Sequence, residues 1–292
     1  MPPVAIPDSL AFAATKPRLF GVDFTCAPGQ RKPIVVALGH LEETGNPNAC
    51  KWRLSLDGFE SFTDFAGFEE LLMRPGPWAG GFDLPFGLPR ELVVQFGWPV
   101  RWPELIRLYS SFSRKDLRDR FKQFCDARAP GNKFAHRATD RPAGSSASMK
   151  WVNPPVAWML HAGAIRLLNA GVSIPGVLNG DSKRVCLEAY PGMLARSVTR
   201  ASYKSDDRRR QTIERQDARQ QILKAVETSD SQPGIATVLS RQDRCIVLND
   251  GSGDSLDALL CLVQVAWSLT DLNRRFGLPA TFDGLEGWIV GA

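Results

Sequence analysis

The chain has 292 residues, of which 43% are hydrophobic and 23% are charged, a composition typical of a globular protein with a large core. Its formal net charge of +5 is a mild basic bias, compatible with a polyanionic partner. The sequence contains no stretch approaching the roughly 20 apolar residues of a membrane-spanning helix, and it does not begin with basic residues followed by a long apolar core, so we expect neither a membrane-spanning nor a secreted protein. The six cysteines form no Cys-x-x-Cys motif, so we expect a cytoplasmic protein in a reducing compartment.

The first part of the chain is predicted to be rich in strands. Residues 1–17 contain four prolines without periodicity and are expected to form an irregular lead-in. Three strands are predicted next, at Leu19–Phe24, Ile34–Leu41 and Trp52–Leu56. Turn-rich segments around 28–29 and 45–48 separate them, and such short connections favour an antiparallel meander.

A helix and a parallel strand are predicted after the meander, and a long helical segment follows them. The helix is expected at Phe65–Met73 and the strand at Ala79–Leu84, which should pair in parallel with an earlier strand. Residues 89–175 are predicted to be a mainly helical insertion. Its helices are expected at Arg90–Phe96, Pro103–Ser111, Lys115–Ala127 and Val156–Ala170. The basic loop at 130–154 is long for a compact domain, and this length is typical of a functional or a mobile segment.

The order of elements predicts the fold class. A strand at Arg184–Tyr190, a charged helix at Arg208–Glu227 and an apolar helix that begins at Asp254 complete the chain. This order matches an α/β, ribonuclease H-like mixed sheet with three antiparallel meander strands plus two parallel strands, helices on both faces and a helical insertion. Residues 18–290 would form this single domain, with the first and fourth strands side by side.

Three carboxylates occupy positions that this fold would bring together. Asp23 and Asp83 lie at the carboxyl ends of the first and fourth strands, and Asp257 lies in the first turn of the last helix. Buried carboxylates are costly unless something pairs with them, and a divalent cation would serve all three. The alternatives are local, with Asp23 capping a strand end and Asp83 binding the amides of the Pro-Phe-Gly turn.

Two further acidic residues have competing interpretations. Asp254 and Asp257 lie three residues apart on one helix face, so they could clamp a metal, cap the helix, or divide the two roles with Asp257 as the ligand. Glu188 could be another ligand, could position water, or could pair with Arg184 or Arg196.

The predicted chemistry is phosphodiester hydrolysis with Mg²⁺ or Mn²⁺, using two ions, because hard cations prefer oxygen ligands. The predicted metal ligands are Asp23, Asp83, Asp254 and Asp257. The predicted catalytic residues are Asp23, Asp83, Asp257 and Glu188.

Basic residues gather in two places that could bind nucleic acid. Residues 101–150 hold twelve Lys and Arg against five Asp and Glu. The second cluster runs from Lys204 through Arg208 to Arg219. The predicted nucleic-acid-binding residues are Lys133, Arg137, Arg141, Lys204 and Arg208. The alternative is a set of solvated helix faces, with the interleaved aromatic residues packing the insertion's own core.

Five short motifs make the chain resemble the family known as domain of unknown function 429. They are Gly21-Val22-Asp23, Phe82-Asp83-Leu84-Pro85-Phe86-Gly87-Leu88, Glu188-Ala189-Tyr190-Pro191, Asp254-Ser255-Leu256-Asp257-Ala258-Leu259 and Glu286-Gly287-Trp288. The resemblance covers most of residues 18–290. It implies a predicted nuclease with a ribonuclease H-like fold and a metal site.

Two other function classes compete with a nuclease. A catalytically inactive nucleic-acid-binding or scaffold protein would keep the same residues for capping. An actin-like ATPase or sugar kinase would need a glycine-rich phosphate loop after the first strand, but no glycine follows Asp23 before Gly29. The sequence does not distinguish DNA from RNA or endonuclease from exonuclease action, and it leaves the oligomeric state open.

Overall fold

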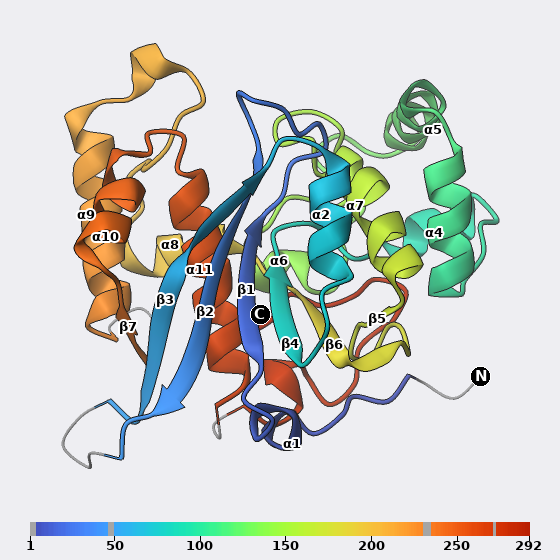
Figure 1. Cartoon of the computed structure of the whole chain (residues 1–292). Helices are drawn as coiled ribbons and strands as arrows, with labels where there is room; N and C mark the ends of the chain where they lie inside the picture. Colours follow the sequence, from blue (N-terminus) through green and yellow to red (C-terminus); the bar gives the residue numbers. More distant parts are fainter. Residues whose placement is uncertain (1–3, 46–49, 230–234, 271–272) are drawn as a thin grey trace.

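A computed structural model describes residues 4–45, 50–229, 235–270 and 273–292. It shows a mixed α/β fold built on one seven-stranded sheet of parallel and antiparallel strands (Figure 1). The order of strands across the sheet is β5-β6-β4-β1-β2-β3-β7. Their bounds are β1 Arg18–Asp23, β2 Ile34–Glu43, β3 Trp52–Phe62, β4 Trp78–Phe82, β5 Val172–Ser173, β6 Asp181–Glu188 and β7 Ile235–Val238.

The predicted pairing of the central strands is confirmed. Strands β1, β2 and β3 form an antiparallel meander, and β4 pairs in parallel with β1 and with β6. The sheet has two more strands than the five expected, because β5 and β7 are too short to give a sequence pattern. Strand β3 continues beyond Leu56, where the predicted strand ended. The prediction stopped there because a bulge opposite Leu38 and Gly39 interrupts the alternation of side chains along β3.

Helices cover both faces of the sheet, as predicted (Figure 1). The first face carries α2 Phe65–Leu72, α3 Arg90–Gln95, α4 Trp102–Ser111, α5 Arg114–Asp126 and α7 Val156–Ala170. The second carries α8 Pro191–Val198, α9 Ile213–Glu227, α10 Arg241–Asn249 and α11 Asp254–Ser268. The remaining short helices are α1 Ser9–Ala13, α6 Asp140–Ala143, η1 Arg208–Arg210 and η2 Arg274–Gly277.

The four predicted helices of the insertion match α3, α4, α5 and α7 within one residue at each end, whereas α6 within the basic loop was not predicted. Two expectations need correction. The lead-in contains α1, whose first turn is capped by the Asp8 side chain. The charged helix expected from Arg208 begins at Ile213, after a separate single turn. Residues 1–3 of the lead-in and 46–49 of the second predicted turn lie outside the described residues.

Helix α11 lies directly against the central strands, and all of its residues except Trp267 are buried. Glycines on β1 and β4 make this close approach feasible. A Cβ atom on Gly21 would lie 2.1 Å from the carbonyl oxygen of Ala258, and one on Gly81 would lie 2.6 Å from Val265 Cγ2. The axis of α11 therefore depends on two strand residues without side chains.

Within the part of the chain that the structure describes, no helix has both the length and the apolar character needed to cross a membrane.

The glycine contact between β1 and α11 gives a test of this packing. Gly21→Ala should lower the free energy of unfolding by about 3 kcal/mol or more, because the new methyl group would meet helix backbone that cannot move aside. Gly29→Ala is the control, since a Cβ atom there meets nothing within 4 Å. Urea denaturation of both variants measures the difference, and equal stability of the two would contradict the proposed packing.

Candidate metal centre

The carboxylates of Asp23, Asp83 and Asp257 converge as predicted. One oxygen from each lies within 4.8 Å of the others, and no other group of three potential ligands among the described residues meets this condition. Asp23 is the last residue of β1, and Asp83 immediately follows β4. The two strands are neighbours in register, with Val22 opposite Phe82. The site is therefore assembled at the carboxyl ends of two parallel strands.

The alternation of side chains along the strands explains which residues meet. Phe20 and Val22 of β1 pack into the core on the α2 and α7 face, whereas Leu19 packs with α11. Asp23 has the same parity as Leu19, so it faces α11. On β4, Ala79 belongs to the α11 face, and Asp83 shares its parity. Both carboxylates are therefore directed towards the first turn of α11, where Asp257 lies.

Asp257 is fully buried, and its carboxylate is held by two consecutive residues of the segment before α9. The hydroxyl of Tyr203 donates to its Oδ1 at 2.6 Å, and the ammonium of Lys204 donates to its Oδ2. Lys204 was predicted to bind nucleic acid, but its Nζ is engaged by this carboxylate. The segment before α9 thus contributes a hydroxyl and a cation to the site.

Asp254 lies beside the cluster but outside the converging group. Its Oδ1 pairs with Lys32 Nζ at 2.5 Å. The capping role considered for Asp254 belongs to Asp250 instead. The carboxylate of Asp250 accepts hydrogen bonds from the amides of Ser252 at 3.0 Å and Ser255 at 2.8 Å. Neither Asp254 nor Asp257 is needed to cap α11.

The electrostatics of the cluster show excess negative charge. Burial, followed by the charges of Asp257 and Asp254, raises the pKa of Asp23 well above its ordinary value. Burial and the charge of Asp257 raise the pKa of Asp83 to about 7. Burial would lower the pKa of Lys32, but Asp23 and Asp254 outweigh it and raise that pKa. Two lysines therefore face four carboxylates, and a divalent cation would balance this charge.

The donor set fits a hard cation. Every converging ligand atom is a carboxylate oxygen, which Mg²⁺ and Mn²⁺ prefer and which disfavours ions that need thiolate or imidazole. Asp23, Asp83 and Asp257 are the residues that would hold it.

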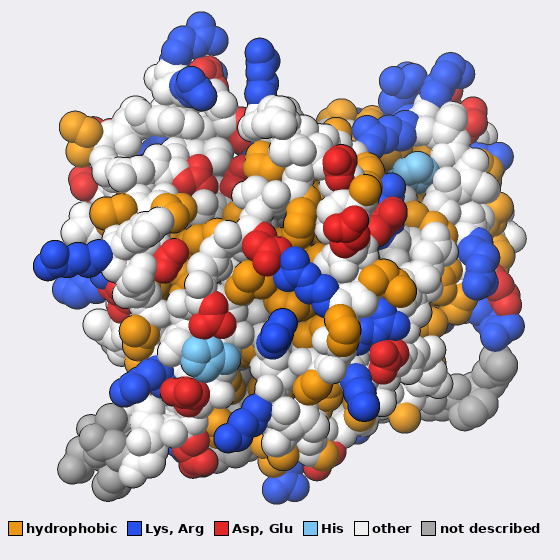
Figure 2. Space-filling view, viewed as in Figure 1, with side chains coloured by type: hydrophobic (Ala, Val, Ile, Leu, Met, Phe, Trp, Pro, Cys, Tyr) orange, Lys and Arg blue, Asp and Glu red, His pale blue; other side chains and the backbone are white. Residues whose placement is uncertain are grey.

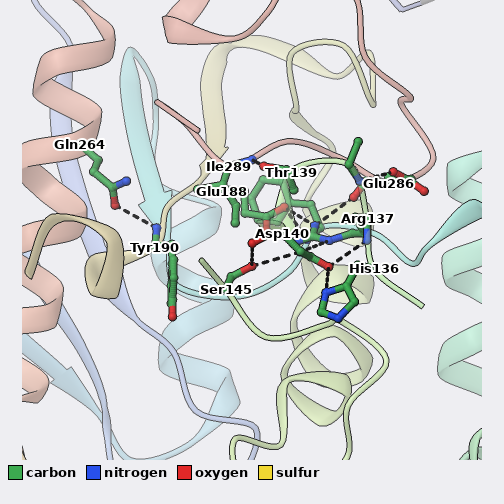
Figure 3. Close-up of polar contacts among 12 residues, drawn as sticks. His136, Arg137, Thr139, Asp140, Ser145, Glu188, Tyr190, Gln264, Glu286 and Ile289 are labelled. Atoms are coloured by element: carbon green, nitrogen blue, oxygen red, sulfur yellow. Dashed lines mark hydrogen bonds and ion pairs between the residues drawn. The ribbon is translucent and has the colours of Figure 1, made fainter. Parts of the chain in front are cut away.

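Glu188 belongs to a separate assembly on the opposite face of the sheet. It is paired in register with Phe82, which packs on the α2 and α7 face. Its carboxylate accepts two hydrogen bonds from Arg137, at 2.8 and 2.6 Å (Figure 3). It accepts a third from the amide of Phe86 at 3.0 Å. Neither Arg184 nor Arg196 is its partner, contrary to the alternative considered from sequence.

Arg137 links the insertion to the edge of the sheet. It is 2% exposed, and its guanidinium also donates to Asp140 at 3.0 Å and to the carbonyl of Glu286 at 3.0 Å (Figure 3). The Glu286 carboxylate accepts hydrogen bonds from the backbone amides of Arg90 and Ala138. The prediction that Arg137 binds nucleic acid is therefore wrong, because the guanidinium is buried between two carboxylates.

A cleft of about 1010 Å³ opens above Asp23 and Asp83. Its polar lining includes Arg31, Lys32, Lys204 and Arg208, so the predicted residues Lys204 and Arg208 both lie in it. Lys133 and Arg141 are exposed but are not among the residues that line this cleft. The basic cluster at 101–150 therefore does not supply the walls of the site.

Sequence reasoning missed Lys32, Tyr203 and the Arg137 partnership. Lys32 and Tyr203 lie 222 and 54 residues from their acidic partners, so no local pattern connects them. The placement of Glu188 could have been inferred from the alternation of side chains along the strands. Glu188 pairs with Phe82, and Asp83, the next residue, points to the opposite face of the sheet. Arg219, counted in the second basic cluster, is buried and donates to the carbonyls of Tyr203 and Leu248.

Comparisons of the chain with protein-family models, with curated proteins and with solved structures gave no match.

The raised pKa of Asp83 predicts a pH dependence of stability. A carboxyl whose pKa is higher in the folded state favours folding when protonated, so its contribution is lost as the pH rises from about 4 towards 7. In EDTA, Asp83→Asn should therefore become more stable than the parent over this window, by on the order of 2 kcal/mol at neutral pH. Melting curves between these pH values measure the difference.

Added Mn²⁺ should reverse the order, raising the melting temperature of the parent more than that of Asp83→Asn. A melting temperature of the parent that ignores Mn²⁺ would count against the metal centre.

The burial of Arg137 predicts a large structural effect. Arg137→Ala should lower the free energy of unfolding by about 3 kcal/mol or more, because it leaves Glu188 and Asp140 buried without their cation. Lys133→Ala and Arg141→Ala remove exposed cations of the same segment and should change it by less than about 0.5 kcal/mol. Adding Glu188→Gln to Arg137→Ala should recover part of the loss. Similar stability of all three single variants would refute the buried clamp.

Proposed function

We propose that this chain is a divalent-metal-dependent nuclease with a ribonuclease H-like fold. The order of the central strands, with a meander followed by a parallel β4 beside β1, supports this fold. The observation that carries the function is the convergence of Asp23, Asp83 and Asp257 at the carboxyl ends of β1 and β4, beneath a cleft lined by cations.

The proposed cofactor is Mg²⁺ or Mn²⁺, with two ions in the active state. Such ions activate water and stabilise the leaving oxygen in phosphodiester hydrolysis. In this scheme Asp23, Asp83 and Asp257 provide oxygen ligands, and Tyr203 fixes the orientation of Asp257 through its hydrogen bond. Arg31 and Arg208 attract the phosphate backbone at the mouth of the cleft.

Glu188 has a different role in this proposal from the catalytic one expected. Its carboxylate is occupied by Arg137 and by the amide of Phe86, so it holds the turn that follows Asp83. Glu188 is thus a positioning residue for Asp83. The six free cysteines support the proposal of a cytoplasmic location.

Hydrolysis by the pure protein should depend on the metal and on the converging carboxylates. Labelled DNA and RNA, single-stranded and duplex, are incubated with Mn²⁺, Mg²⁺ or EDTA. Asp257→Asn should lower the rate by at least about 100-fold while keeping the fold, because the anionic ligand is lost. Asp254→Ser should retain substantially more activity, since its oxygens do not converge with the three.

Asp206→Asn is the matched control, because Asp206 lines the same cleft but is exposed, pairs with Lys32 and lies outside the converging group. Its rate should stay within a few-fold of the parent. Equal rates in Asp257→Asn and Asp206→Asn, or hydrolysis that continues in EDTA, would rule out the proposed centre.

A further inference from the structure

The cleft above the carboxylates has two kinds of wall. One is basic and is formed by Arg31 and Lys32 together with Lys204 and Arg208. The ion pair of Lys32 with Asp206 at 3.0 Å joins these two segments into one surface. Figure 2 shows basic side chains at the upper edge of the molecule, above the segment that precedes α9.

The other wall is apolar and belongs to the start of α7. It consists of Pro154, Pro155, Val156 and Met159, which are exposed or half-buried. Helix α7 covers the opposite face of the sheet from α9 (Figure 1). The cleft therefore passes over the ends of β1 and β4, between a basic and an apolar surface.

The acidic residues of the lining do not cancel the basic wall. Asp206 is paired with Lys32, and the Asp250 carboxylate is directed at the amides that begin α11. Asp23 and Asp83 lie at the base of the cleft with the proposed metal. Arg31 and Arg208 are exposed at its mouth, where an anion can reach them.

Two such walls suit a polymer with an anionic edge and apolar faces. An unpaired nucleic acid strand presents phosphates on one side and the faces of its bases on the other, and these faces pack on apolar or aromatic side chains. In a duplex the base faces are stacked inside, so an apolar wall would contact only sugar and phosphate. The volume of about 1010 Å³ is close to the upper end of small-molecule sites, which suits a short stretch of one strand.

We infer that the substrate of this site is single-stranded nucleic acid, with its phosphates on Arg31 and Arg208 and its base faces on Pro154, Val156 and Met159. This inference rests on the proposed nuclease function, because the strand is placed by the carboxylates at the base of the cleft. The apolar wall selects unpaired strands, and the basic wall binds any phosphate backbone.

Binding of matched oligonucleotides tests the inference separately from hydrolysis. Fluorescence anisotropy is measured with one labelled strand, alone and annealed to its complement, as DNA and as RNA. Ca²⁺ is present so that the carboxylates are neutralised. The parent protein should bind the single strand at least about 10-fold more tightly than the duplex.

Variants of the two walls should separate their roles. The double variant Val156→Ser and Met159→Ser should lose most of this preference without a change in salt dependence. Arg31→Ala combined with Arg208→Ala should weaken both forms and reduce the salt slope of single-strand binding by about 1.4. Val94→Ser is the control, because Val94 is 58% exposed on α3, outside the residues that line the cleft.

Equal binding of single strand and duplex, no binding of either, or an unchanged preference in the Val156 and Met159 variant would overturn the inference. If metal-dependent hydrolysis that requires Asp257 persists in that case, the proposed function stands and only the strand preference is wrong. If the single strand is preferred but no nucleic acid is hydrolysed, the binding inference holds and the nuclease assignment fails.

Discussion

The contact of α11 with Gly21 and Gly81 is the constraint on which the candidate site depends. A strand residue with a side chain at either position would meet the helix, at distances as short as 2.1 Å for a single methyl group. Asp257 lies one residue before Ala258, whose carbonyl faces Gly21. Any displacement of the helix from the strands would therefore carry Asp257 away from Asp23 and Asp83. The two glycines weaken their strands intrinsically, but they allow three carboxylates to meet.

The period of two along the strands divides the polar residues at this edge of the sheet into two assemblies. Asp23 and Asp83 face α11, where four carboxylates meet two lysines. Glu188 faces the other side of the sheet, where it forms an ion pair with the guanidinium of Arg137. Burial raises the pKa of Glu188, and the charge and hydrogen bonds of Arg137 oppose this rise. The second assembly ties the insertion to the sheet, and its carboxylates are hydrogen-bonded to Arg137 and to backbone amides. The first assembly lies at the base of the large cleft, where Asp23 and Asp83 line the cavity, so the two assemblies have different roles.

Much of this arrangement could be predicted from sequence, because it rests on local signals. The apolar run that ends at Asp23, the repeat of that pattern at Asp83 and the helical insertion each gave the correct element. The residues that were mispredicted depend on tertiary contacts. Arg137 lies in a basic loop that suggests a surface, and only the fold shows that Glu188 and Asp140 surround it. Likewise, Lys32 and Tyr203 become site residues because distant turns meet above α11.

The local explanations for the acidic residues are better met by other side chains, and this strengthens the case for a cation. The start of α11 is capped by Asp250, so Asp254 and Asp257 are not required there. The Phe86 amide in the turn after Asp83 donates to Glu188, so Asp83 is not required for that bond. What remains for Asp23 and Asp83 is burial together with repulsion by Asp257, and these raise the pKa of both. Neutral residues at these positions would give a more stable metal-free fold, and a divalent cation bound there would offset the repulsion that the carboxylates create.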